Sequence, residues 1–299
     1  MTAQIMKKSA PIFIDVRGLR YHVRTWGEKT RRPIFMLHGW MDNSASFQYV
    51  VDHLKEDYYI IAPDWRGCGD SQWSDDGSYW FNDYLADLQA LLQHFQPETP
   101  VDLICHSMGF NIGSVYAGVF PHRVRRLVNL ECHGFREVSP EDHPARYAEW
   151  LEAVAEKKIG PGYPSFDRIA EKLQAANPAL RPGQSEYLAR HLARMGDDGV
   201  VRMLNDPAQR SPTNKMLYVG LLRPEEAEAC WKRVEARVLW IEGGKSDVPR
   251  QIGATPEQLA RRRSAFRSLD VKVIADAGHL VHVEYAKDVA AAIEEFLLI

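Results

Sequence analysis

The stretch Val101-Asp102-Leu103-Ile104-Cys105-His106-Ser107-Met108-Gly109 decides how this chain folds. Its first residues are apolar enough for a buried strand, and a segment rich in Gly, Ala and Ser with helical character follows directly. A serine at the turn between such a strand and helix is held in an unfavourable backbone conformation, with its hydroxyl above the sheet edge. The N–H groups that begin the helix then point towards whatever the hydroxyl attacks. The pattern predicts a serine nucleophile at Ser107 and acyl-transfer chemistry.

Length, charge and composition exclude several classes of protein. The chain has 299 residues, a formal net charge of −3 and an ordinary globular composition, which gives no argument for nucleic acid or a membrane as partner. No apolar stretch is long enough to span a bilayer, and residues 1–9 lack the apolar core of a secretory signal. The cysteines are scattered as reduced thiols would be, at Cys68, Cys105, Cys132 and Cys230. We expect a cytoplasmic protein.

The sequence gives no sign of a metal or a cofactor. Its 11 histidines show no H-E-x-x-H pattern or similar ligand spacing. We therefore expect no metal site and no cofactor. The oligomeric state stays open, and a homodimer is compatible with the sequence.

Short apolar runs alternate with helical periods along most of the chain. Two runs around Arg17-Gly18 predict a hairpin, and helical spacing marks residues 47–54, 81–95 and 289–297. Alternation of this kind predicts an α/β fold, with a mainly parallel central sheet covered by helices on both faces. The predicted strands are residues 11–16, 20–26, 33–37, 58–62, 101–104, 124–130, 237–241 and 271–274.

The alternation stops after Glu131. From there to residue 232 the sequence shows helical segments without buried strands between them, at about 166–176, 185–195 and 224–234. We therefore predict a helical cap insertion over 132–232, and a core domain formed by 1–131 and 233–299.

A serine nucleophile needs a base and a group that orients the base. His279 follows the last predicted strand and is the candidate base, whereas His282 is interpreted as a surface residue at the start of the last helix. Asp247 follows the strand at 237–241, and the chain order Ser107, Asp247, His279 is the order expected for this arrangement. Glu131, at the end of the preceding strand, is the alternative acid.

The oxyanion of an acyl-transfer intermediate needs N–H donors, and the sequence offers two. Met108 begins the helix after the nucleophile, and Trp40 follows a strand end and Gly39, which lets the backbone turn towards the site. His38 is interpreted as a structural hydrogen-bonding residue and His106 as a packed one. The predicted pocket residues are His38, Gly39, His106, Phe110, Tyr147 and Trp150, with Trp73, Trp80, Tyr163 and Tyr187 as further aromatic candidates near its mouth.

Three motifs together resemble the α/β-hydrolase superfamily over nearly the whole chain. They are His38-Gly39-Trp40, the run Asp64-Trp-Arg-Gly-Cys-Gly-Asp-Ser71, and the serine elbow. The segments 128–131, 229–233 and 278–284 further resemble its serine hydrolase-like branch. The resemblance implies a capped, cofactor-free hydrolase that uses the nucleophile, base, acid and oxyanion donors named above.

The elbow departs from the family pattern at two positions. Cys105 replaces the usual first glycine, and Phe110 stands where a second glycine often follows. A serine at position 107 argues against dehalogenases and epoxide hydrolases, which carry aspartate at the apex.

The sequence therefore predicts an esterase that cleaves small carboxylic esters with apolar groups, and thioesters, through an acyl-enzyme. Carbon–carbon bond hydrolysis, acyl transfer and lyase chemistry by the same site remain alternatives, because one fold supports many reactions. A non-catalytic binding protein with an idle pocket is the third hypothesis.

Overall fold

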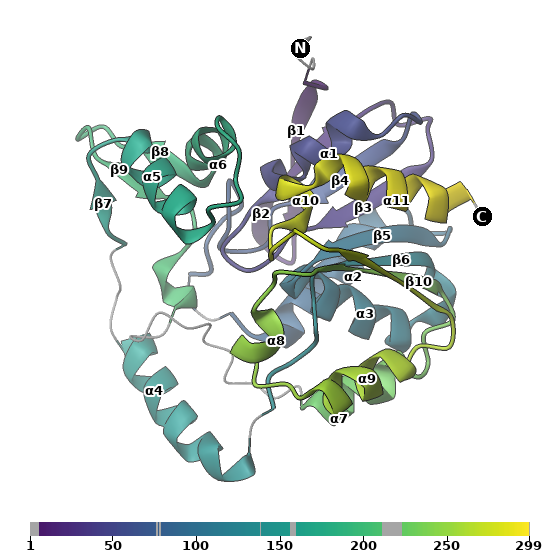
Figure 1. Cartoon of the computed structure of the whole chain (residues 1–299). Helices are drawn as coiled ribbons and strands as arrows, with labels where there is room; N and C mark the ends of the chain where they lie inside the picture. The colour runs from purple at the N-terminus through teal and green to yellow at the C-terminus, as the bar shows by residue number, and fades with distance from the viewer. Residues whose placement is uncertain are drawn as a thin grey trace.

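In the computed structural model, eight strands form one twisted sheet in the order β1-β2-β4-β3-β5-β6-β10-β11 (Figure 1). The structure describes residues 6–75, 77, 79–137, 139–155, 160–210 and 223–298. The strands of this sheet are β1 (Ser9–Val16), β2 (Leu19–Trp26), β3 (Pro33–Leu37), β4 (Tyr59–Pro63), β5 (Val101–His106), β6 (Val124–Leu130), β10 (Arg237–Gly243) and β11 (Leu269–Ile274).

The sheet is parallel from β4 to β11 and antiparallel at its other edge. β1 and β2 form the predicted hairpin, with Val16 opposite Leu19, and β2 pairs antiparallel with β4. β3 lies between β4 and β5, so the chain crosses over twice before it reaches the serine turn. All parallel strands point their carboxyl ends towards one edge, where ligands bind in sheets of this kind.

Helices cover both faces of the sheet and bury one hydrophobic core on each (Figure 1). α1 and α11 cover one face, where Ile34, Ile104 and Val128 point. α2, α3 and α7 cover the other, where Leu103, Leu127 and Trp240 point. The helices outside the segment described next are α1 (Gln48–His53), α2 (Phe81–Phe95), α3 (Met108–Val119), α7 (Pro224–Trp231), α8 (Val248–Gln251), α9 (Pro256–Ser264), α10 (Val281–Glu284), α11 (Ala286–Leu298) and the 3₁₀ turns Ser44–Phe47 and Pro121–Arg123.

The chain leaves the main sheet between β6 and α7. In this inserted segment, which we define as residues 139–210, three short strands form a separate antiparallel sheet in the order β7-β9-β8. The prediction of helices alone was therefore wrong for this part of the chain. Residues 138, 156–159 and 211–222 of the predicted insertion lie outside the described residues. The elements here are α4 (His143–Ala155), β7 (Gly162–Tyr163), α5 (Phe166–Ala176), α6 (Gln184–Leu192), β8 (Ala193–Met195), β9 (Val201–Met203) and the 3₁₀ turns Pro140–Asp142 and Pro207–Gln209.

The last helix of the predicted insertion, α7, packs on α3 of the core. A Cβ at Gly118 of α3 would lie 2.1 Å from the Cys230 carbonyl oxygen of α7, so the two backbones meet directly. The Trp231 indole N–H donates to Ser114 Oγ at 2.8 Å across the same contact. The predicted insertion ends at residue 232, but the chain rejoins the core earlier, because α7 already packs on α3. No helix in the described ranges is long and apolar enough to cross a bilayer.

The helix after the serine turn packs on the sheet through a small residue opposite Cys105. A Cβ built at Gly113 of α3 would lie 2.9 Å from Cys105 Sγ, closer than real atoms approach. Cys105 stands where the family pattern has glycine, and the absence of a side chain at Gly113 of α3 leaves room for its sulfur. Cys105 is fully buried and its packing leaves the turn itself intact.

We predict that substitutions at positions 105 and 113 have strongly non-additive effects on the free energy of unfolding. Gly113→Ala should destabilise the native chain by about 1–3 kcal/mol through overpacking. In the Cys105→Ala background the same substitution should cost nothing, or stabilise by up to about 1 kcal/mol, because alanine favours the helix. Urea unfolding of the four proteins of this double-mutant cycle measures both values. Equal costs of Gly113→Ala in the two backgrounds would contradict the packing described here.

Candidate active site

Ser107 lies at the sharp turn between β5 and α3, as the sequence predicts. Its backbone has φ +50° and ψ −118°, in a region that residues with side chains rarely adopt. The Ser107 N–H donates to the Leu130 carbonyl at 3.1 Å, and its own carbonyl accepts from Phe110 N–H at 2.9 Å. A conformation of this kind costs about 1–3 kcal/mol and persists where neighbouring structure holds it, as at many functional sites.

Two glycines allow the backbone to come close to Ser107. A Cβ at Gly109 would lie 2.2 Å from the Leu37 carbonyl oxygen, so α3 can begin directly against the end of β3. A Cβ at Gly39 would lie 3.2 Å from Ser107 Cβ and 2.8 Å from His106 Nδ1. The predicted pocket residue Gly39 therefore brings the main chain of the β3 end alongside the nucleophile candidate.

The two predicted oxyanion donors lie on these approaching segments. Met108 is the first residue of α3, and Trp40 follows Gly39 at the end of β3. Among the described residues, neither backbone N–H donates to a protein acceptor. Both groups are therefore available to an oxygen held above Ser107.

His279, the predicted base, lies in the loop between β11 and α10, with its side chain 35% exposed. Its Nδ1 lies 3.2 Å from Glu131 Oε2. Its main-chain carbonyl accepts a hydrogen bond from His106 Nε2 at 2.9 Å, which ties the loop to the residue before Ser107. The base candidate is therefore fixed both through its ring and through its backbone.

Glu131, the alternative acid, is a fully buried carboxylate directly after β6. It accepts hydrogen bonds from Gly243 N–H at 3.0 Å, Ser246 Oγ at 2.6 Å and His133 Nε2 at 3.1 Å, in addition to His279. Burial alone would raise its pKa, but the hydrogen bonds from His133 and His279 outweigh this and hold the pKa of Glu131 at about 2. An ionised carboxylate is therefore built in behind His279.

No hydrogen bond or ion pair joins Asp247, the predicted acid, to His279 among the described residues. Its side chain is 50% exposed and binds Gln251 Nε2 at 2.9 Å and Arg250 Nη2 at 3.3 Å, both within the next turn of chain. The hydrogen bond from Gln251 lowers the pKa of Asp247. β10 ends at Gly243, and Asp247 lies four residues later at the N-cap position of α8, with its side chain half-exposed.

Ser107 and His279 are not joined by a hydrogen bond in the described part of the chain. Both lie at the carboxyl ends of the parallel strands, and the neighbouring rings of His106 and His279 have centroids 4.8 Å apart. Serine–histidine contacts of this kind often tighten only when substrate occupies the site.

His38 serves the structure, as predicted. Its side chain is fully buried, Nδ1–H donates to the Gly39 carbonyl at 2.7 Å, and Nε2 accepts from Trp65 N–H at 2.9 Å. Both ring nitrogens are therefore occupied, which leaves none for a substrate in a pocket. His106 is buried and packed, also as predicted.

Two other predictions need correction. Phe110 does not line a pocket, because its fully buried ring packs on Trp240 and Phe266 with centroids 5.4 and 6.1 Å away. His282 is not a surface residue: it lies fully buried in α10. Phe110 faces the core because the helix that starts at Met108 turns this side chain towards β10.

The predicted pocket aromatics of α4 meet different partners. The Trp150 ring packs on Trp80, with centroids 5.0 Å apart, and so connects α4 to the start of α2. The Tyr147 ring faces His143 of its own helix at 6.2 Å. Trp40 itself is half-buried, with the Arg210 guanidinium 5.4 Å from its ring centre.

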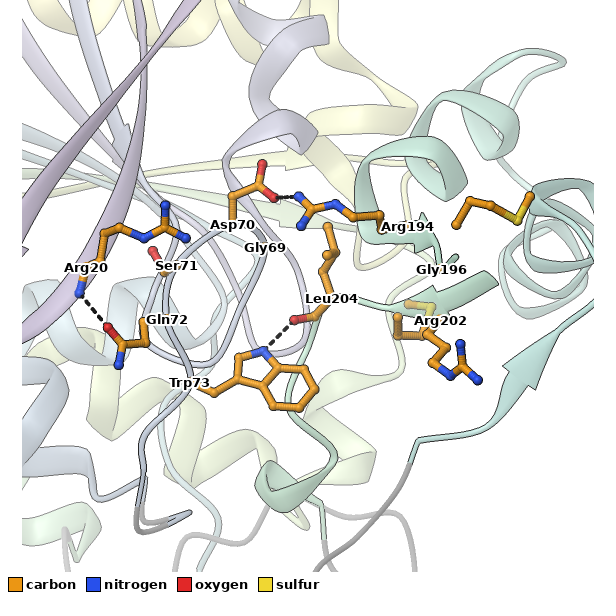
Figure 2. A pocket seen from close by; sticks show the side chains of 12 residues that line it. Arg20, Gly69, Asp70, Ser71, Gln72, Trp73, Arg194, Gly196, Arg202 and Leu204 are labelled. Atoms are coloured by element: carbon orange, nitrogen blue, oxygen red, sulfur yellow. Dashed lines mark hydrogen bonds and ion pairs between the residues drawn. The ribbon is translucent and has the colours of Figure 1, made fainter. Parts of the chain in front are cut away.

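A separate charged cavity of about 380 Å³ lies between the main sheet and the small sheet of the inserted segment (Figure 2). Arg194 and Asp70 form an ion pair across it, and Trp73 Nε1 donates to the Leu204 carbonyl at 2.8 Å. Ser107, Glu131 and His279 do not line it. Its lining residues are Arg20, Gly69, Asp70, Ser71, Gln72, Trp73, Arg194, Met195, Gly196, Arg202, Met203 and Leu204.

Two partners of the buried acid are not predictable from the sequence. Ser246 and His133 bind Glu131 from the β10–α8 turn and from the chain after β6. Glu131 itself was named as the alternative acid from its place at the end of a predicted strand, which is β6 and lies between β5 and β10 in the sheet. Ser246 carried no signal, because a serine in a surface turn has no distinguishing pattern.

Comparison with known proteins agrees with this fold. The sequence model of the family described as the alpha/beta hydrolase fold matches residues 32–286. A serine hydrolase-like protein of Danio rerio is 29% identical over 306 residues, which cover 99% of this chain and 91% of the relative.

Two solved structures show the same fold at low sequence identity. The thioesterase domain from the curacin biosynthetic pathway superposes with a TM-score of 0.84 at 22% identity, over 96% of this chain and 99% of that domain. An esterase of Mycobacterium tuberculosis superposes with a TM-score of 0.72 at 21% identity, over 98% of this chain and 92% of that one. The chain belongs to the α/β-hydrolase family.

Proposed function

We propose that this protein is a serine hydrolase that cleaves carboxylic esters, and thioesters of similar shape, through an acyl-enzyme on Ser107. One observation carries the proposal: the His279–Glu131 hydrogen bond of 3.2 Å lies behind a serine held at φ +50°. A strained serine, a histidine and a buried ionised carboxylate at adjoining strand ends are the groups that nucleophilic acyl transfer requires.

In the first step, Ser107 Oγ attacks the ester carbonyl carbon while His279 Nε2 takes the hydroxyl proton. Glu131 accepts the Nδ1–H of the same ring, which selects the reactive tautomer and stabilises the imidazolium that forms. The N–H groups of Trp40 and Met108 donate to the oxyanion of the tetrahedral intermediate. The C–O bond to the alcohol then breaks, and the alcohol leaves with the proton from His279.

In the second step, His279 takes a proton from water, which attacks the acyl-enzyme carbonyl. The second tetrahedral intermediate collapses, the carboxylic acid leaves, and Ser107 regains its proton from His279. Every step uses water and groups of this chain, so the proposed reaction requires no cofactor.

The aromatic side chains support an ester with apolar groups of modest size. The half-buried Trp40 ring adjoins the proposed oxyanion donor, and the Trp80–Trp150 pair connects the core with the inserted segment. Such rings supply large apolar contact areas with few polar atoms. The match in fold to a thioesterase domain supports the inclusion of thioesters.

Removal of the nucleophile should abolish turnover. With short-chain nitrophenyl esters, we expect Ser107→Ala to lose about 10³-fold or more of kcat, because the acyl-enzyme cannot form. A fluorophosphonate probe should label the wild type and leave Ser107→Ala unlabelled. Ser264→Ala is the matched control, since Ser264 is an exposed serine outside the site. Equal labelling or equal turnover of wild type and Ser107→Ala would reject the proposal.

The two carboxylates provide a second test. Glu131→Gln should lower kcat by about 10³–10⁴-fold, because the amide cannot stabilise the imidazolium and favours the wrong tautomer. Asp247→Asn should leave kcat within about 3-fold of the wild type, since Asp247 is half-exposed and its partners in the described part of the chain are its neighbours Arg250 and Gln251. Thermal unfolding of both variants verifies that the comparison is made on folded protein. A larger loss of kcat in Asp247→Asn than in Glu131→Gln would show that the acid is assigned to the wrong residue.

A further inference from the structure

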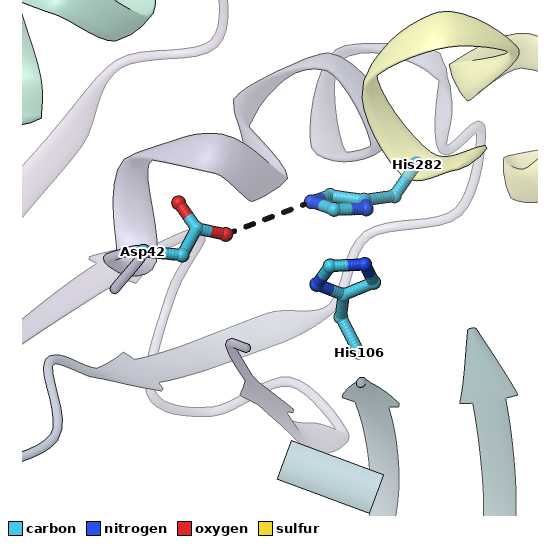
Figure 3. Close-up of side chains that lie close together, drawn as sticks. All are labelled: Asp42, His106 and His282. Carbon is cyan, nitrogen blue, oxygen red and sulfur yellow. Dashed lines mark ion pairs between the residues drawn. The ribbon is translucent and has the colours of Figure 1, made fainter. Parts of the chain in front are cut away.

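Three side chains that the proposed reaction does not use meet beside the site (Figure 3). Asp42 lies two residues after Trp40, His106 ends β5, and His282 belongs to α10. Each offers one ligand atom, and the three atoms lie within 4.8 Å of one another. Asp42 Oδ2 is 3.9 Å from His282 Nε2, and the rings of His106 and His282 have centroids 4.2 Å apart.

The two histidines of this cluster have buried nitrogen atoms without hydrogen-bond partners. His282 is fully buried and His106 is 2% exposed, yet both nitrogens of His282 and Nδ1 of His106 lack a partner among the described residues. Buried polar atoms in native proteins are almost always paired, so each unpaired atom calls for an explanation. Figure 3 shows that one nitrogen of each ring lies on the side of Asp42, so the unpaired groups and the carboxylate converge.

The chemical state of these groups suits metal coordination. His106 Nε2–H donates to the His279 carbonyl at 2.9 Å, so Nδ1 of the neutral ring carries the free electron pair. Both rings are buried, His282 fully and His106 to 2% exposure, and burial disfavours the charged form of an imidazole. The Ser46 hydroxyl donates to Asp42 Oδ2 at 2.8 Å, as groups that orient a ligating carboxylate do.

We propose that Asp42, His106 and His282 form a binding site for one divalent transition-metal ion, of the class that prefers imidazole and carboxylate ligands, such as Zn²⁺. Ligand bonds of about 2.1 Å place the atoms of a tetrahedral site about 3.4 Å apart. The observed separations of 3.9 Å and at most 4.8 Å therefore close with side-chain shifts of about 1 Å or less. The Asp42 side chain is 14% exposed, which gives an ion and its remaining water ligand a route to the site.

A second histidine–carboxylate cluster shows what a satisfied network looks like. His22, Asp64 and Asp70 also bring three potential ligand atoms together. There, His22 Nδ1 binds Asp64 Oδ2 at 2.7 Å, and Asp64 also accepts from the Ser44 and Asp70 N–H groups at 2.7 and 3.0 Å. Among the described residues, no buried side-chain nitrogen or oxygen of this second cluster lacks a partner, so it carries no comparable signal for an ion.

The proposed ion would connect three segments on which the proposed reaction depends. Asp42 belongs to the loop of the oxyanion donor Trp40, His106 precedes the nucleophile, and His282 follows the base by three residues. An ion that binds the folded chain and not the unfolded one raises the unfolding temperature. The ligands come from distant parts of the sequence, which explains why no ligand spacing is visible in it.

The test uses the metal-stripped full-length protein titrated with CoCl₂ and, separately, with ZnCl₂. We expect one equivalent of Co²⁺ to produce the visible absorption of a tetrahedral or five-coordinate ion, and Zn²⁺ to displace it and raise Tm. Asp42→Asn and His282→Gln should each weaken binding by about 10-fold or more, since the loss of even an outer partner of a ligand costs 10–100-fold. His122→Gln, which removes an exposed histidine elsewhere, should bind as the wild type does.

The outcomes are decisive in either direction. The absence of saturable Co²⁺ absorption in the wild type would overturn the proposal. Equal binding by the wild type, Asp42→Asn and His282→Gln would overturn it as well, because it would mean an adventitious ion only. Circular dichroism without metal verifies that each variant is folded. If His282→Gln unfolds because position 282 is buried, Asp42→Asn, at a partly exposed position, still tests the proposal. Ser107→Ala should bind Co²⁺ like the wild type, so a failure of the proposed ester hydrolysis leaves this result unaffected.

Discussion

A main-chain contact between α3 and the end of β3 fixes the position of the nucleophile candidate. Gly109 stands where any Cβ would lie 2.2 Å from the Leu37 carbonyl oxygen, so the helix begins immediately after Ser107 and forces it to φ +50°. The same strand end continues through His38 and Gly39 to Trp40. Because one backbone contact positions both the serine and the oxyanion donors, their relative geometry does not depend on flexible side chains.

The second constraint is the cost of a buried negative charge. A carboxylate in the interior must be paired and hydrogen-bonded, and Glu131 meets this requirement with donors from three separate parts of the chain. Within the described ranges, the partners of the Asp247 side chain are Arg250 and Gln251 of the next turn, so its place in the chain order carried no information about its surroundings. The order of residues along the sheet identified the two candidate strand ends, and of the two carboxylates it is the buried Glu131 that lies beside His279.

Regular periodicity made most of the central sheet predictable. The β1–β2 hairpin, the parallel strands and the Thr255–Gln258 capping box of α9 all follow local signals of composition or spacing. β7, β8 and β9 have two or three residues each, which is too short for an alternating pattern to be visible. Their pairing depends on contacts between distant residues, so a helical reading of the inserted segment was the only one that local signals could support.

The four histidines at the site show why the role of a side chain cannot be predicted from a sequence pattern alone. His38 has both nitrogens bound, His106 has one bound, and His279 is bound to a carboxylate. Neither nitrogen of His282 is bound to any described residue, although this side chain, like that of His38, is fully buried. The imidazole group thus serves as a structural hydrogen-bonding group, a packed side chain, a base candidate or a ligand candidate, depending on its partners. Since those partners come from four different strand ends and loops, only the assembled fold distinguishes the roles.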